Sequence, residues 1–428
     1  VPPELAVRLF RVYGDLAEDA LRDDPYLLSD PYFGADFAAV DAFALELDVE
    51  ADDERRVEAG ILFELSYNLT NGHTFIPQNK LIPATAALLN LDSETIESGM
   101  ERLDEQQRMV RSEVAGLTAC YLPEFYEAEC EVTERLVRMA DLRIQPPSKL
   151  EAILRSIEEK RAIDYAASQM QAIRDAASCQ LLLVTGGPGT GKTTVMTGIL
   201  DLFDAMGLKT QLAAPTGRAA KRLSEVTGRE ATTIHRLLEV DYSGGVVSFI
   251  HNDKNLLKCD VVILDEMSMV DVKLFQALIA ALRYSCRIIM VGDADQLPSV
   301  GPGNILGEVI RSGLVPTVCL NEIFRQAKRS LIVENAHHII SSEPLQKGGK
   351  TDDFFFLESD GDAAQKLVCD LVTTRLPRSY GFDPVRDIQV LCPTKLGPTG
   401  TQALNVELQN LLNPEQKGKP QLLSLIHI

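Results

Sequence analysis

The sequence lacks tryptophan, long apolar runs, paired cysteine motifs and an initiator methionine, and the last three absences restrict its class. No apolar run approaches the roughly 18 residues of a membrane-spanning helix, so we expect no membrane span and no membrane partner. The eight cysteines are scattered without a C-x-x-C pair, which argues against a disulfide framework or a zinc site and indicates reduced thiols in the cytoplasm. The chain starts at Val1 without a signal peptide, so we expect it to begin inside a longer protein.

Positive charge is scarce in the first third of the chain. Residues 1–145 contain 30 acidic and 12 basic residues, a net charge of −18, whereas residues 146–428 contain 32 acidic and 30 basic residues, a net charge of −2. A net charge of −20 over the whole chain ordinarily counts against a nucleic-acid-binding protein. Because nearly all of it lies in the first third, the remainder can still carry a local basic groove. Charge therefore leaves nucleic acid open as a partner.

The 428 residues suffice for two to four domains, and a change of pattern divides them. Apolar residues recur every three or four positions through residues 1–145, which predicts a mostly helical, acidic domain. The adjacent prolines Pro146 and Pro147 mark a boundary, and residues 146–166 are expected to form a linker helix. From Gln180 onward, short apolar runs alternate with helical periods, which indicates an α/β fold with a doubly wound parallel sheet.

The α/β part is expected to form two lobes. Five apolar runs are the expected strands of the first lobe, which covers residues 167–322: 181–185, 210–214, 261–264, 287–291 and 315–320. A glycine pair between strand-forming residues predicts a small hairpin at about 240–258. A later apolar run at 388–392 is expected to start a strand of the second lobe, of which residues 323–428 contain only a part.

The first expected strand leads into a phosphate-binding motif. Residues 186–193 read GGPGTGKT, which fits the pattern G-x-x-x-x-G-K-[ST], and a helical pattern follows. Glycines let backbone N–H groups surround phosphate oxygens, Lys192 reaches the β and γ phosphates, and the Thr193 hydroxyl can ligate Mg²⁺. The alternative is a glycine-rich structural turn, which is the weaker interpretation between a strand and a helix. The predicted cofactors are therefore ATP and Mg²⁺, and the predicted contacts are Gly187, Pro188, Gly189, Thr190, Gly191, Lys192, Thr193 and Thr194.

Two carboxylates end another expected strand. Asp265 and Glu266 follow the run at 261–264, and ligands of an α/β sheet collect at the carboxyl ends of its strands. Asp265 is then placed to hold Mg²⁺ through water, and Glu266 to orient the attacking water or accept its proton. The alternative is a helix N-cap, because aspartate is favoured there and a helix is expected to follow.

Two further polar residues suit nucleotide hydrolysis. Gln296 follows the run at 287–291 and can hydrogen-bond a γ-phosphate without adding charge, with an ordinary turn glutamine as the alternative. Arg325 suits an arginine finger that neutralises transition-state charge, with a surface salt bridge as the alternative.

Together these motifs, in this order and spacing, resemble the RecD-like family of superfamily-one DNA helicases, similar to the alpha subunit of exodeoxyribonuclease V. The resemblance runs from about Gln169 to Pro414 and continues through further segments: 214–220, 232–238, 265–269, 292–301, 324–326 and 389–405. Four segments of the N-terminal third resemble the long form of the family, which acts independently of RecBC: 13–15, 24–26, 56–61 and 72–74.

The resemblance implies two RecA-like lobes that close around ATP and move 5′→3′ along single-stranded DNA, in repair or recombination. The expected partners are single-stranded DNA and duplex junctions, and the expected state is a monomer. Gln169 matches the adenine-reading glutamine of the family, and the hairpin at 240–258 matches a pin that splits the duplex, with a plain connecting hairpin as the alternative. The expected DNA contacts are Pro215, Thr216, Arg218, Thr233 and His235. For His235 the alternative is a buried core histidine.

Two departures from the family pattern limit what the chain is expected to do. Near residues 34–41 the family has a helix-hairpin-helix with a Gly-x-Gly turn, but here Asp36 replaces the second glycine, so we expect packing rather than DNA binding. A small barrel insertion and two further motifs do not occur before Ile428, and residues 422–428 match no family pattern. We therefore expect a chain truncated at both ends that binds nucleotide but unwinds DNA poorly or not at all by itself.

Two other functions stay open. The same superfamily core serves helicases that track along RNA. A truncated chain with an intact nucleotide pocket can also act as an ATP-gated nucleic-acid-binding module without turnover.

Overall fold

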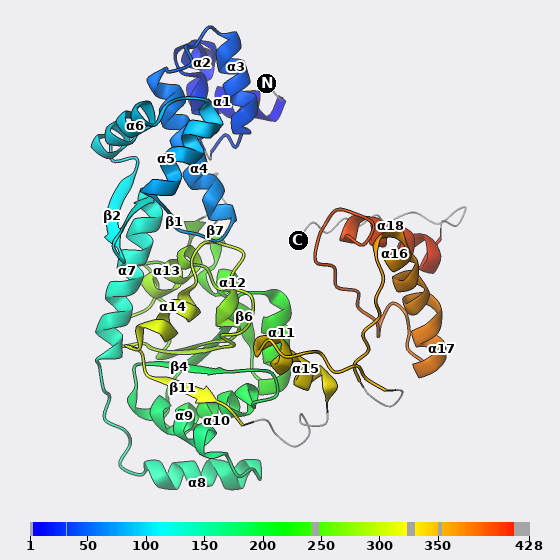
Figure 1. Cartoon of the computed structure of the whole chain (residues 1–428). Helices are drawn as coiled ribbons and strands as arrows, with labels where there is room; N and C mark the ends of the chain where they lie inside the picture. Colours follow the sequence, from blue (N-terminus) through cyan, green and yellow to red (C-terminus); the bar gives the residue numbers. More distant parts are fainter. Residues whose placement is uncertain (1–2, 31, 242–247, 323–329, 350–352, 415–428) are drawn as a thin grey trace. The chain divides into compact units, whose positions relative to one another are not determined.

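The computed structural model describes residues 3–30, 32–241, 248–322, 330–349 and 353–414. The chain divides into two compact units (Figure 1). The first unit contains Val1–Arg329 and Val333–Glu343, and the second contains Ser330–Ile332 and Pro344–Ile428. None of the helices in the described ranges is both long and apolar enough to cross a membrane.

The N-terminal part of the first unit is mostly helical, as predicted. Its helices are α1 (Pro3–Tyr13), α2 (Ala17–Asp23), α3 (Phe37–Glu46), α4 (Glu54–Thr70), α5 (Gln78–Leu89), α6 (Ser93–Glu105) and α7 (Pro123–Ala140). A small antiparallel sheet that the sequence patterns did not predict has the order β1 (Phe75–Pro77), β3 (Leu117–Tyr121), β2 (Val110–Val114). Ala115 and Gly116 join β2 to β3 with φ values of 50° and 79°, as the twist of a two-residue hairpin turn requires.

Asp36, the residue that departs from the Gly-x-Gly turn of the resembled family, starts helix α3. Its carboxylate accepts a hydrogen bond from the Ala39 N–H at 3.3 Å. This contact satisfies one of the free N–H groups at the beginning of the helix. It supports the packing role that we expect for this turn.

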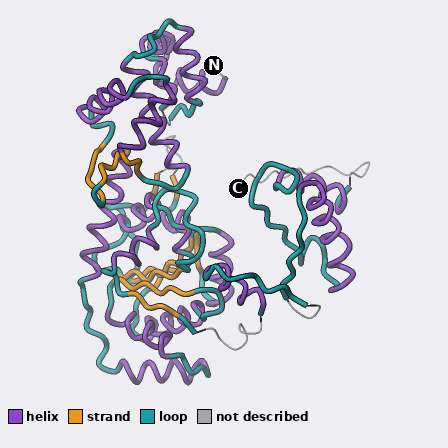
Figure 2. Tube along the Cα trace, viewed as in Figure 1, coloured by secondary structure: helices purple, strands orange, loops and turns teal. Residues whose placement is uncertain are grey.

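A six-stranded parallel sheet forms the centre of the first unit, with helices on both faces (Figures 1 and 2). Its strands, in spatial order, are β11 (Thr317–Leu320), β4 (Leu181–Gly186), β10 (Arg287–Gly292), β9 (Val261–Leu264), β5 (Thr210–Ala214) and β6 (Ala231–Thr233). Every neighbouring pair is parallel, which confirms the predicted doubly wound sheet and its five expected strands. Strand β6 is an additional edge strand.

The remaining helices of this part lie before, between and after the strands of the sheet along the chain. They are α8 (Leu150–Arg161), α9 (Ala167–Ser178), α10 (Lys192–Ala205), α11 (Gly217–Thr227), α12 (Ile234–Leu238), α13 (Val272–Ala280), α14 (Ile305–Ser312) and α15 (Leu331–Ile340). At the place of the predicted hairpin, β7 (Val240–Asp241) pairs antiparallel with β8 (Ser248–Phe249), and the glycine turn expected between them lies outside the described residues. Its role as a pin stays a prediction.

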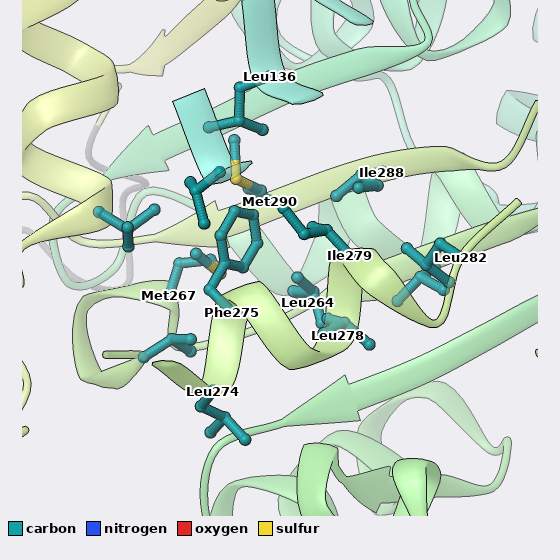
Figure 3. Close-up of a cluster of buried hydrophobic side chains, with 14 of the residues drawn as sticks. Leu136, Leu264, Met267, Leu274, Phe275, Leu278, Ile279, Leu282, Ile288 and Met290 are labelled. Carbon is teal, nitrogen blue, oxygen red and sulfur yellow. The ribbon is translucent and has the colours of Figure 1, made fainter. Parts of the chain in front are cut away.

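Both faces of the sheet are buried, which explains why its strands are apolar throughout rather than alternating. Leu264 and Met290 face a core that they share with α7, α13 and α14 (Figure 3). Ile263 and Ile289, one position earlier on the same strands, face a second core with α9 and α10. Leu136 of α7 lies in the first core, so this helix packs against the sheet although it falls within residues 1–145.

The described part of the second unit is helical. It contains α16 (Gly361–Asp370), the π-helical turn η5 (Leu371–Arg375), α17 (Leu376–Tyr380) and α18 (Thr401–Leu412). The strand expected at 388–392 was wrong, because these residues form no strand and Leu391 is 83% exposed. An apolar run forms a strand only where a neighbouring strand completes its backbone hydrogen bonds, and the described residues of this unit supply none.

Candidate nucleotide site

The register of the parallel sheet brings three loops to one edge. Met290 of β10 lies beside Leu183 of β4 on one side and Leu264 of β9 on the other. The segments that follow these three strands therefore leave the sheet next to one another. They carry the predicted phosphate-binding loop, the Asp265–Glu266 pair and Gln296, so the sequence motifs converge as the strand order requires.

The phosphate-binding loop has the backbone that its glycines predict. Gly189 and Gly191 have φ values of 76° and 84°, a conformation that favours glycine, and Lys192 begins helix α10. The Thr190 hydroxyl donates to the Gly187 carbonyl oxygen at 2.9 Å. The Lys192 ammonium donates to the same oxygen at 3.0 Å and to the Gly186 carbonyl. The loop thus holds a cationic group beside the N-terminus of a helix, an arrangement that suits a phosphate anion.

A cavity of about 640 Å³ opens at this loop. Its walls are residues 187–194, Ala219, Arg222, Leu223, Val226, Asp265, Glu266, Asp293 and Gln296. The structure therefore brings together every predicted phosphate contact, both carboxylates and the predicted sensor. Arg325, the predicted arginine finger, lies outside the described residues.

The first carboxylate of the cavity, Asp265, has a perturbed pKa. Burial, and secondly the charge of Glu266, raise the pKa of Asp265 to about 6. Glu266 has φ 54° and ψ 45°, a left-handed conformation that is unfavourable for a residue with a side chain. The N-cap alternative for these residues was wrong. Glu266 precedes a short 3-10 helix without a side-chain cap hydrogen bond, and helix α13 is capped by Asp271, whose carboxylate accepts from the Leu274 N–H at 2.8 Å. The Asp265 carboxylate accepts from the Glu266 N–H at 3.0 Å, and both side chains line the cavity.

The donor set fits a magnesium ion that arrives with a nucleotide. Thr193 and Asp265 both line the cavity and offer hydroxyl and carboxylate oxygens, the ligands that Mg²⁺ prefers. A divalent cation there would also relieve the repulsion between Asp265 and Glu266. Within the described ranges, no group of three or more histidine, cysteine, aspartate or glutamate side chains could hold a metal. Phosphate oxygens and water would have to complete the coordination.

Gln169 lies beside the loop rather than in the cavity wall. It is buried at the beginning of α9, where its Oε1 accepts from the Ala166 N–H at 3.1 Å. Its Nε2 donates to the Thr190 carbonyl at 3.4 Å. Both ends of the amide thus have protein partners that join α9 to the loop. Adenine recognition by Gln169 stays a prediction.

The predicted DNA contacts follow two adjacent strands, β5 and β6. Ala214 pairs with Thr233 in the sheet, so Thr216 and Thr233 begin helices α11 and α12 at the same edge. Their hydroxyls accept from the Ala219 and Arg236 N–H groups at 3.2 and 3.1 Å and cap these helices. Pro215 lies between β5 and this cap, half-buried.

The two predicted DNA contacts with ionisable side chains face solvent. Arg218 and His235 are exposed, which excludes the buried-core alternative for His235. The His235 ring is tilted against Phe249 of the hairpin, with 6.0 Å between ring centroids. An exposed imidazole and guanidinium beside two capped helix ends can approach a phosphate backbone.

Sequence reasoning missed two charged residues of the cavity. Asp293 is buried at the end of β10, with its carboxylate 3.7 Å from the Lys192 ammonium. The signal was available, because Asp293 follows its strand as Asp265 follows β9. Arg222 lines the cavity from helix α11. It is three residues after Ala219, which also lines the cavity, so both lie on the same face of the helix.

The phosphate-binding loop follows β4, and carboxylates follow β10 and β9, the next two strands across the sheet. This arrangement in a parallel sheet defines a P-loop nucleotide-binding protein with a RecA-like lobe. Two family comparisons narrow the class. Residues 1–75 match the family described as the ATP-dependent RecD2 DNA helicase HHH domain, and residues 169–302 match the family described as an AAA domain.

Individual relatives agree with these matches. The chain is 32% identical over 423 residues to the ATP-dependent RecD2 DNA helicase of Deinococcus radiodurans, which covers 96% of this chain and 57% of that protein. It is 31% identical over 303 residues to the RecBCD enzyme subunit RecD of Mycobacterium tuberculosis, with 61% of this chain and 50% of that protein covered. It is 41% identical over 124 residues to the ATP-dependent DNA helicase dda of Enterobacteria phage T4, with 28% of each covered.

These matches over the helical domain and the RecA-like lobe show that the chain is similar to RecD-like helicases, as the sequence motifs predict. The chain spans between about a quarter and three fifths of the length of these relatives.

Proposed function

We propose that this chain is the ATP-hydrolysing part of a helicase that moves 5′→3′ along single-stranded DNA, of the repair and recombination type. One observation carries the proposal: the phosphate-binding loop, the Asp265–Glu266 pair and Gln296 all line one cavity. The relatives named for ATP-dependent DNA helicase activity support the choice of ATP as nucleotide and DNA as track.

We assign tasks in hydrolysis to five residues of the cavity and to Arg325, which lies outside the described residues. The Lys192 ammonium leaves the carbonyl groups of the loop and neutralises the β and γ phosphates. Glu266 orients the attacking water and accepts its proton, and Gln296 hydrogen-bonds the γ-phosphate. Arg325 adds positive charge as the transferred group develops negative charge. Thr193 and Asp265 would hold a magnesium ion, which supplies charge neutralisation between the β and γ phosphates.

The predicted DNA contacts lie on the same edge of the sheet as the nucleotide cavity. Helix α11 contributes Thr216 and Arg218 at its beginning and Arg222 to the cavity wall. A change in the cavity therefore reaches the predicted DNA contacts through one short helix. Hydroxyl groups and backbone N–H groups suit contacts with a sugar–phosphate backbone that do not depend on base sequence.

Stimulation by nucleic acid tests the function directly. We expect single-stranded DNA to raise the ATPase rate of the chain at least about tenfold, because strand binding and the ATP site share α11. Oligonucleotides of equal length in DNA and RNA form are compared at one salt concentration, since phosphate contacts depend on salt. Stronger stimulation by RNA would favour an RNA-tracking helicase. Nucleotide binding without any turnover would favour an ATP-gated binding module.

The pH dependence of nucleotide binding tests the carboxylate pair. Because the pKa of Asp265 is raised to about 6, its carboxylate becomes neutral as the pH falls through this value and loses affinity for a cation. We expect the affinity for a magnesium–nucleotide complex to fall about tenfold per pH unit below pH 6. Equilibrium titration with a fluorescent ADP derivative between pH 5 and 8 measures the effect.

Glu266→Gln is the matched control for this titration. The charge of Glu266 is the second cause of the raised pKa, so its removal is expected to move the loss of affinity to lower pH. An identical pH profile in both proteins would attribute the loss to the nucleotide itself and contradict the role of the pair.

A further inference from the structure

Ser268 contacts Gln296, the predicted phosphate sensor. It lies in the short 3-10 helix η3 (Met267–Met269) and is 6% exposed. Its hydroxyl donates to Oε1 of Gln296 at 3.3 Å. The two residues are 28 positions apart and belong to the loops after β9 and β10.

The backbone around the cavity brings this hydroxyl to the sensor. The left-handed conformation of Glu266 turns the chain sharply at the end of β9, and the next residues enter η3. On the other side, the Gln296 N–H donates to the Asp293 carbonyl at 3.3 Å, which closes a tight turn after β10. The Ser268–Gln296 hydrogen bond joins these two turns. The segment with the catalytic carboxylates is thereby connected to the sensor.

In the structure the Ser268 hydroxyl donates to the amide oxygen of Gln296, and this orientation leaves the other end of the amide for the cavity. A glutamine amide has one acceptor oxygen and an NH₂ group with two donors. Because the Ser268 hydroxyl occupies the oxygen, the NH₂ group is left for the cavity. An ionised phosphate only accepts hydrogen bonds, so it requires a donor at this position. The opposite orientation would place the amide oxygen against phosphate oxygens and repel them.

We propose that Ser268 is a positioning residue for nucleoside triphosphates, which holds Gln296 with its NH₂ group toward the γ-phosphate. The inference rests on the proposed function, since it assigns Gln296 to the γ-phosphate. Ser268 acts only through Gln296 and touches no phosphate. Its removal lets the exposed Gln296 side chain sample other rotamers and both amide orientations. The γ-phosphate then loses a prepared donor, whereas a diphosphate, which has no γ-phosphate, loses nothing.

The preference for triphosphate over diphosphate measures this role. Fluorescent derivatives of ADP and of a non-hydrolysable ATP analogue are titrated, with magnesium, into the chain and into Ser268→Ala. We expect Ser268→Ala to bind the ATP analogue about fivefold more weakly and ADP within about twofold of the parent. Ser268→Thr keeps the hydroxyl and is expected to restore the affinity for the analogue. Equal weakening for both nucleotides would indicate a merely structural role and overturn the inference.

A double-mutant cycle shows whether Ser268 acts through Gln296. In a Gln296→Ala background, Ser268→Ala is expected to weaken analogue binding by less than about twofold further, because the two residues share one interaction. If Ser268→Ala weakens analogue binding by the same factor with and without Gln296, the inference is overturned. Ser299→Ala is the control, since Ser299 is also buried in the loop after β10 but donates to the Gly301 and Gly303 carbonyls. If it lowers analogue affinity as much as Ser268→Ala, general loosening of the loop explains both.

The outcomes for Lys192 separate this inference from the proposed function. If the parent chain binds neither nucleotide, or if Lys192→Ala binds the analogue as the parent does, the proposed function itself fails. If Lys192→Ala weakens binding while Ser268→Ala leaves the analogue-to-ADP ratio unchanged, only the positioning role fails.

Discussion

Replacement of Lys192 by alanine is expected to lower the DNA-stimulated turnover of ATP by about a thousandfold or more. The Lys192 ammonium lies 3.0 Å from the Gly187 carbonyl oxygen and 3.7 Å from the Asp293 carboxylate. Phosphate oxygens carry more negative charge than a carbonyl, so a bound triphosphate draws the ammonium to itself. Without this cation, the charge that develops during cleavage is left uncompensated in a partly enclosed cavity. Steady-state ATPase rates at saturating single-stranded DNA measure the loss.

Lys149→Ala is a suitable control for the loss of one lysine. Lys149 is exposed before helix α8 and does not line the cavity, so its replacement is expected to leave kcat unchanged. Far-ultraviolet circular dichroism checks that both variants keep the parent fold. A Lys192→Ala protein with more than about a tenth of the parental kcat would show that the loop is a structural turn.

Glu266→Gln is expected to lower kcat by about a hundredfold to a thousandfold while the affinity for nucleotide changes by less than about threefold. Glutamine keeps the size of the side chain but cannot accept the proton of the attacking water. Removal of one negative charge beside phosphate does not weaken ground-state binding. Glu266→Gln is therefore expected to lower kcat without lowering nucleotide affinity, whereas Lys192→Ala is expected to lower both. Rapid-quench measurement of a single turnover, together with equilibrium binding, distinguishes the two effects.

Glu239→Gln is the control for this substitution. Glu239 also has a positive φ, 56°, but it lies before the hairpin strand β7 and outside the cavity. The same substitution there tests whether the loss of a glutamate charge at a residue with positive φ is harmful in itself. Loss of nucleotide affinity in Glu266→Gln comparable with its loss of kcat would contradict a role confined to the chemical step.

The sequence was most informative where a local pattern carries its own geometry. The glycines of residues 186–193 predict a loop that only their backbone freedom allows, and Gly189 and Gly191 have the positive φ values expected. The apolar run 261–264 predicts a buried strand because both faces of a parallel sheet are covered. Each of these predictions needs only neighbouring residues.

The sequence was least informative where a segment depends on a distant partner. The run 388–392 is as apolar as the strands of the sheet, yet it forms no strand in the described structure. The small sheet of β1, β2 and β3 was missed because its strands are short and because β1 pairs with β3 across α5 and α6, although β2 and β3 form a local hairpin. Strand formation is decided by hydrogen bonds to another segment, which a single run of residues does not record.

By itself, the sequence determined the class of this protein: the order of strands and helices, the phosphate-binding loop, and the carboxylates that follow β9. These follow from steric and hydrophobic patterns within a few residues. Only the tertiary structure decided that Asp293 meets Lys192, that burial raises the pKa of Asp265, and that Ser268 holds Gln296. Such contacts join residues that are tens of positions apart, and their distances depend on the register of parallel strands, which is established only when the whole sheet assembles.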